Sequence, residues 1–146
     1  MLFNILSYMN HRLLTDGNTV ASIDEAYLFL SNLTTIEYIR NAMKRVRKKN
    51  SAVLLASQNI DDFLAPDVRE YTNPLFAIPA NRFLFYPGHV EQRNFCDALS
   101  ISPAEYALID HPERGVCLYH CGNARYLLQV QAPEFQAKLF GDAGGR

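Results

Sequence analysis

The feature that most constrains this chain is a long helical segment enclosed by two short apolar runs. The enclosing runs are TVASI at 19–23 and SAVLLASQ at 51–58, and each has the length and character of a buried strand. Residues 32–50 place apolar side chains on one helical face, at Ile36, Ile39, Met43 and Val46. Strands that alternate with helices indicate an α/β fold with a mostly parallel sheet, and we expect helices on both of its faces.

Finer expectations concern the ends of these segments. Thr34 or Thr35, followed by Glu37, predicts a capped start for the central helix. The run at 51–58 is apolar until its polar end, which is typical of a strand that is covered on both faces.

The remaining elements follow from spacing and turn residues. Residues 59–80 predict a short helix and then irregular chain, because proline interrupts the pattern. We further expect a helix over 2–14 ended by the turn TDGN, a strand in 81–88, helices in 89–100 and from Pro103, an antiparallel hairpin of 115–121 and 124–132 around Gly122-Asn123, and a closing helix in 132–140.

Length, charge and cysteine content narrow the class of protein. The 146 residues are enough for one domain, and we expect a single domain over 1–146. A formal net charge of −1 gives no global reason for binding nucleic acid or membranes. Three cysteines and the absence of a signal-like N-terminus favour reduced thiols and a cytoplasmic location.

Polar residues stand where both apolar runs end. Asp24 and Glu25 follow the first run, and Gln58 ends the second. In parallel sheets, functional side chains gather beyond the carboxyl ends of the strands. There, one carboxylate can hold Mg²⁺, a second can activate water, and an amide can contact a γ-phosphate. The alternative is ordinary acidic residues in the first turn of a helix and a polar strand end.

The central helix ends in the basic sequence KRVRKK at 44–49, and Arg40, Lys44 and Arg47 share one face. A solvated helix end explains these charges as readily as a function does. The functional alternatives are an arginine that reaches a phosphate across a subunit interface and contact with a nucleic-acid backbone. The planar guanidinium favours Arg47 for the phosphate role.

Three segments together carry a family resemblance. SIDEAYLFL at 22–30, RNAMKRVRKKNSAVLLASQNIDDFL at 40–64 and RGVCLYHCGNARYLLQVQAPEFQAKLF at 114–140 resemble the C-terminal part of the conjugative-transfer ATPases of type IV secretion systems. The resemblance implies a partial RecA-like P-loop NTPase fold. It also implies a hexameric motor that couples ATP hydrolysis to DNA or protein export, with other secretion components, at the cytoplasmic face of the bacterial inner membrane.

The resemblance implies a role for each site residue. Asp24 corresponds to the Walker B acid that binds Mg²⁺, Glu25 to the catalytic glutamate, and Gln58 to a sensor glutamine. Arg47 matches the basic residue of a Gly-Arg-Lys-like motif, although Val46 replaces its glycine. Ser57 stands where the family has threonine before the glutamine.

The Walker A sequence G-x-x-x-x-G-K-[ST] does not occur in these 146 residues. We therefore expect a chain truncated after that region, which depends on an upstream Walker A half for ATP and Mg²⁺ and is inactive by itself. Two alternatives stay open, a catalytically inactive RecA-like assembly module and a DNA translocase of the same superfamily, and the basic segment Lys44–Lys49 is a candidate contact for DNA.

Two other kinds of site, a zinc site and a cysteine nucleophile, have less support in the sequence. The set His111, Cys117, His120 and Cys121 matches no standard zinc spacing, and His120 and Cys121 would point to opposite faces of a strand. No nucleophile motif surrounds Cys96 or Cys117.

Overall fold

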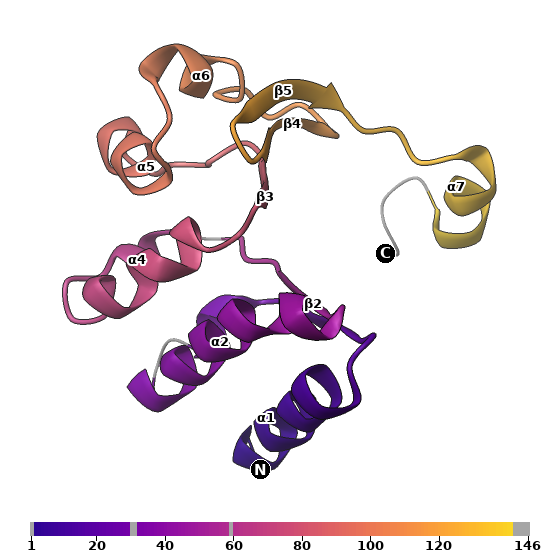
Figure 1. Cartoon of the computed structure of the whole chain (residues 1–146). Helices are drawn as coiled ribbons and strands as arrows, with labels where there is room; N and C mark the ends of the chain where they lie inside the picture. Colours follow the sequence, from indigo (N-terminus) through magenta and orange to yellow (C-terminus); the bar gives the residue numbers. More distant parts are fainter. Residues whose placement is uncertain (1, 30–31, 59, 142–146) are drawn as a thin grey trace. The chain divides into compact units, whose positions relative to one another are not determined.

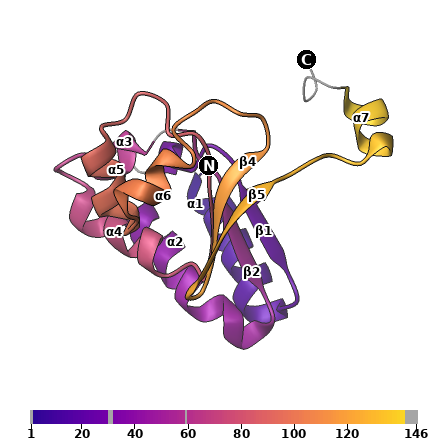
Figure 2. The same cartoon turned by 90° about the horizontal axis from the view of Figure 1, so that it is seen from above.

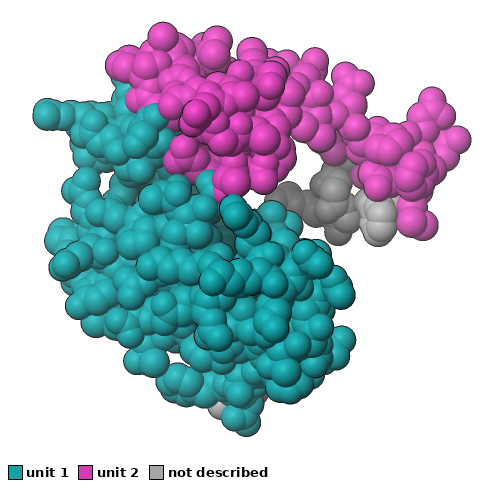
Figure 3. All heavy atoms as spheres, viewed as in Figure 1, with its two compact units in different colours: residues 1–79, 89–100 teal, residues 80–88, 101–146 magenta. Residues whose placement is uncertain are grey.

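A computed structural model describes residues 2–29, 32–58 and 60–141 of the chain (Figure 1). The chain divides into two compact units, one of residues 1–79 and 89–100 and the other of residues 80–88 and 101–146 (Figure 3). The single domain expected from length stays a prediction. Among the described residues, no helix has the length and apolar character that crossing a bilayer requires.

The first unit alternates helices and strands as the sequence pattern predicts. Its elements are α1 (Leu2–His11), η1 (Arg12–Asp16), β1 (Val20–Ile23), η2 (Ala26–Phe29), α2 (Leu33–Arg45), η3 (Val46–Lys49), β2 (Ala52–Leu55), α3 (Asp61–Leu64), α4 (Arg69–Ala77) and α5 (Gln92–Leu99). β1 and β2 pair in parallel, from Val20 opposite Ala52 to Ile23 opposite Leu55. Figure 2 shows the two strands side by side.

One face of the β1–β2 pair is buried against helices. The core on this face contains Ile23, Ala26, Ile36, Ile39, Phe63 and Leu75. The opposite face of the strand pair is not covered as the sequence predicts, because Val20 is 71% and Leu54 is 54% exposed. Alternation of side chains along a strand places these two residues away from the helices.

The start of α2 also differs from the prediction. Asn32, in extended conformation, is the N-cap, and its Oδ1 accepts a hydrogen bond from the Thr34 amide over 2.9 Å. Thr35 lies inside the helix and is buried. Asparagine is among the best N-cap residues, and the helix begins two residues earlier than a cap at Thr34 predicts.

Helix α4 occupies a stretch predicted to be irregular. Pro74 lies inside it, and the helix continues as far as Ala77. The helix is also held from outside, because the Thr72 hydroxyl donates to the Phe63 carbonyl oxygen over 2.5 Å. This buried hydrogen bond joins α4 to the end of α3.

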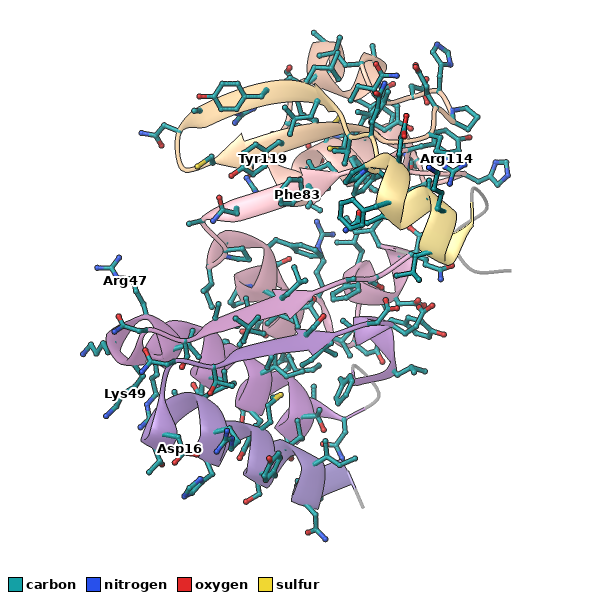
Figure 4. The ribbon with its side chains drawn as sticks, turned by 90° about the vertical axis from the view of Figure 1, so that its right-hand side faces the viewer. Asp16, Arg47, Lys49, Phe83, Arg114 and Tyr119 are labelled. Atoms are coloured by element: carbon teal, nitrogen blue, oxygen red, sulfur yellow. The ribbon has the colours of Figure 1, made fainter. Side chains whose placement is uncertain are left out.

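The second unit is built on an antiparallel sheet of order β3-β4-β5. Its elements are β3 (Asn81–Leu84), α6 (Pro103–Ala107), β4 (Val116–Cys121), β5 (Ala124–Gln129) and α7 (Glu134–Phe140). The predicted hairpin around Gly122-Asn123 is confirmed, and β3 joins it through the Phe83–Tyr119 pair. The rings of these two residues stack with centroids 4.5 Å apart (Figure 4).

The predicted start of α6 at Pro103 is confirmed. Ser102 is the N-cap, and its hydroxyl accepts from the Glu105 amide while the Glu105 carboxylate accepts from the Ser102 amide. This reciprocal capping box satisfies two amides that the helix itself leaves unpaired.

Candidate functional site

The carboxyl ends of β1 and β2 bring together two of the residues singled out in the sequence. The Gln58 amide nitrogen donates to the Glu25 carboxylate, with 2.5 Å between Nε2 and Oε1. These residues are 33 positions apart in the chain. Parallel pairing of the two strands is what makes them neighbours.

The backbone between β1 and η2 contains one extra residue. The Ala56 amide donates to the Ile23 carbonyl oxygen, and the Ala56 carbonyl oxygen accepts from the Ala26 amide, both over 2.9 Å. In a regular parallel ladder, the Ala56 carbonyl oxygen would accept a hydrogen bond from the Glu25 amide instead. Glu25 is therefore displaced from the ladder, as in a β-bulge, a feature found often beside active sites.

Displacement of Glu25 has two visible consequences. Its φ angle is +52°, in the left-handed region that non-glycine residues seldom adopt. Its amide, which has lost the ladder acceptor, donates instead to Oδ1 of Asp24 over 2.9 Å. Asp24 thus supports the bulge with one carboxylate oxygen, a local role that its sequence position did not indicate.

The donor set suits a magnesium ion held jointly with a phosphate. Asp24 is exposed and offers a carboxylate at the strand end. The described residues contain no group of three or more metal-ligating side chains. Mg²⁺ commonly takes only one or two carboxylates from a protein and completes its shell with water and substrate phosphates, so Asp24 fits this chemistry.

Arg47 lies at the other end of the strand pair. It belongs to η3, which immediately precedes β2, and Figure 4 shows it projecting with Lys49 from that end. Its neighbours Lys44, Arg45, Lys48 and Lys49 are also exposed, and in the described part of the chain no ion pair reaches any of the five. Arg40 differs, because it pairs with Glu37 over 3.8 Å. The structure thus separates Arg47 from Glu25 and Gln58 within one chain.

The second unit contains a polar cluster that the sequence did not predict. An Arg82 guanidinium nitrogen lies 3.0 Å from Nδ1 of the buried His120, and Arg125 pairs with Glu105 over 2.5 Å. Cross-strand register brings the cluster together, since His120 lies opposite both arginines. Periodicity alone gives no signal for such pairs.

Of the four candidate zinc ligands, His120 and Cys121 lie on opposite faces of the sheet, and His111 lies before β4. β4 extends to Cys121, and His120 is buried while Cys121 is exposed, as expected for adjacent strand residues. Burial raises the pKa of the Cys117 thiol, which makes it a poor nucleophile.

Comparison with solved structures relates this chain to VirB4. Over 94% of its length it matches the structure of VirB4 of Thermoanaerobacter pseudethanolicus, with a TM-score of 0.84 and 30% sequence identity. No protein-family model and no curated protein matches the sequence. This similarity supports the relation to type IV secretion ATPases that the sequence segments indicate. The mixed α/β fold is consistent with part of a RecA-like domain.

The chain matches only part of the VirB4 structure. The chain covers 38% of that protein. Activities that depend on the rest of a VirB4-like protein therefore belong to the proposal that follows.

Proposed function

We propose that this chain is the C-terminal portion of the ATPase domain of a type IV secretion motor that couples ATP hydrolysis to DNA or protein export. The hydrogen bond between Glu25 and Gln58 at the carboxyl edge of β1–β2 carries the proposal, because it pairs a base and an amide where RecA-like sites act on phosphate. The 30% identity with VirB4 over nearly the whole chain supports it.

Each residue at this edge has a distinct part in the proposal. Asp24 would hold Mg²⁺, directly or through water, and the bound ion would neutralise charge on the ATP phosphates. Glu25 accepts a proton from the attacking water. Gln58 contacts the terminal phosphate through its amide. An upstream Walker A segment supplies the phosphate cradle.

Arg47 acts between copies in this proposal. Because it stands at the amino end of β2, it is suited to reach a phosphate bound by a neighbouring copy rather than by its own chain. A ring such as a hexamer repeats this head-to-tail contact. We place the assembly, with other secretion components, in the cytoplasm at the inner face of the bacterial inner membrane.

Substitution of Glu25 tests the proposed function. Joined to a segment that carries Walker A, the protein should hydrolyse ATP, and Glu25→Gln should lower turnover by about 10²–10⁴-fold while nucleotide still binds. Glu113→Gln removes an exposed carboxylate of the second unit and serves as the matched control. Unchanged hydrolysis in Glu25→Gln would refute the assignment.

The alternatives make different predictions in the same assay. A catalytically inactive assembly module would not hydrolyse ATP even with Walker A supplied. A DNA translocase would hydrolyse ATP faster when DNA is added, and neutralising the exposed cluster at Lys44–Lys49 would remove that stimulation.

A further inference from the structure

The Glu25 carboxylate is held by Gln58 at a point where the backbone is itself in an unfavourable conformation. Glu25 has φ +52°, and residues in such regions persist where their surroundings hold them, often at sites that change state. Four hydrogen bonds hold this one, from the Ala26 amide to Ala56, from the Leu28 amide to the Glu25 carbonyl oxygen, from the Glu25 amide to Asp24, and from Gln58 to the carboxylate. Only the last involves the side chain of Glu25.

We propose that Gln58 is a positioning residue that clasps Glu25 until a phosphate group arrives, and that this phosphate releases Glu25 by taking the Gln58 amide as its own donor. This inference rests on the proposed function and adds regulation to the same site. It makes activation of water depend on a bound terminal phosphate.

The chemistry of the two acceptors explains the exchange. While Oε1 of Glu25 accepts from the Gln58 amide, that oxygen is occupied and is not free to accept a hydrogen bond from an attacking water. A phosphate and a carboxylate that share one amide would repel each other at short range. The phosphate therefore displaces the carboxylate from Gln58 when it occupies the site.

The setting of the clasp makes it easy to open. The Glu25–Gln58 hydrogen bond is exposed to solvent, where water competes for both partners. Gln58 lies beyond the last residue of β2, so its side chain can turn without breaking a ladder hydrogen bond. Breaking the clasp leaves the backbone contacts of Ala26 and Ala56 in place.

The resting contact can be tested on the 146-residue chain by NMR. The side-chain amide signals of Gln58 should move toward those of an exposed glutamine such as Gln136 when Glu25 is changed to alanine. The Gln136 signals are the internal control and should not move. Identical Gln58 signals in the wild type and in Glu25→Ala would overturn the proposal.

Release is tested by nucleotide binding in the protein joined to a Walker A segment. Glu25→Ala removes a negative charge in any background, but it removes the clasp only where Gln58 is present. It should therefore raise the affinity for a magnesium-bound, non-hydrolysable ATP analogue about two- to tenfold more in the wild-type background than in Gln58→Leu.

The outcomes separate this inference from the proposed function. Equal effects of Glu25→Ala in the two backgrounds would overturn the clasp, even if ATP hydrolysis depends on Glu25 as proposed. Failure to bind the analogue at all would contradict the proposed function and the release step together, whereas the NMR signals would still report the resting contact.

Discussion

Arg82 and His120 face each other across β3 and β4, with 3.0 Å between the guanidinium nitrogen and Nδ1. Because arginine can only donate, Nδ1 is the acceptor and the imidazole is neutral with its proton on Nε2. His120 is 2% exposed, and within the described residues its Nε2 has no hydrogen-bond partner. Burial lowers the pKa of His120, and the charges of Arg82 and Arg125 lower it further against a smaller opposing effect of Glu105.

This arrangement predicts a loss of stability in mild acid. The folded state keeps His120 neutral, whereas the unfolded chain takes up a proton as the pH falls below about 6.5. The free energy of unfolding should therefore decrease from pH 7 to pH 5, by at most about 1.4 kcal/mol per pH unit from this residue. Denaturant titrations should show a smaller decrease in His120→Gln. The exposed His89 gives the control His89→Gln, and equal slopes in the two variants would contradict the prediction.

Glu105 predicts a second loss of stability, at lower pH than the one predicted for His120. Its hydrogen bond from the Ser102 amide, followed by that from Arg125, lowers its pKa to about 2. The stabilisation is present above the unfolded pKa and is lost as the pH falls from about 4.5 toward 2. Since water screens this carboxylate, Glu105→Gln should cost about 1 kcal/mol or less at pH 7. Urea unfolding at pH 7 and pH 3 should show the difference shrinking in acid, and a constant difference would argue against the ionic contribution.

The buried hydroxyl of Thr72 predicts an effect on the first unit. Thr72→Val keeps the shape of the side chain but leaves the Phe63 carbonyl oxygen without this donor, which should cost about 1–3 kcal/mol in unfolding free energy. Thr72→Ser retains the hydroxyl and should be less destabilising than removal of the donor. Thermal denaturation compares the two, and a Thr72→Val variant as stable as the wild type would show that the hydrogen bond contributes nothing net.

Gly115 predicts a steric requirement at the base of the hairpin. Its φ is +78°, and an added Cβ would lie 2.2 Å from the Val130 carbonyl oxygen. Gly115→Ala should therefore destabilise the second unit by more than about 1 kcal/mol. At Gly122, where φ is also positive but no atom lies within 4 Å, alanine should cost less. Melting temperatures in the order wild type, Gly122→Ala, Gly115→Ala would support this account.

The proximity of Glu25 and Gln58 can be predicted from the sequence, because it depends only on the order and direction of the two strands that they follow. Alternating strand and helix places both residues at carboxyl ends, and parallel pairing makes these ends adjacent. The polar cluster around His120 depends instead on the register of three antiparallel strands, which periodicity does not specify.

Local chemistry explains the elements that the sequence misplaced. Asn32 rather than a threonine caps α2, and from its extended backbone its Oδ1 reaches the Thr34 amide. Pro74 suggested a break, yet α4 continues to Ala77, with Thr72 buried and Leu75 packed in the core of the first unit. The exposure of Leu54 follows from which strand face the helices cover, and an unbroken apolar run carries no information on that choice.

The bulge at Glu25 is in the end a matter of chain length. Between Ile23 and the ladder contact at Ala26, the first strand has one residue more than its partner uses. A chain shortened by that residue could pair without interruption and without a left-handed φ, but it would carry one acid where there are now two. The residue that interrupts the ladder is thus the one that supplies the second acid, and a single-residue deletion here would remove both features together.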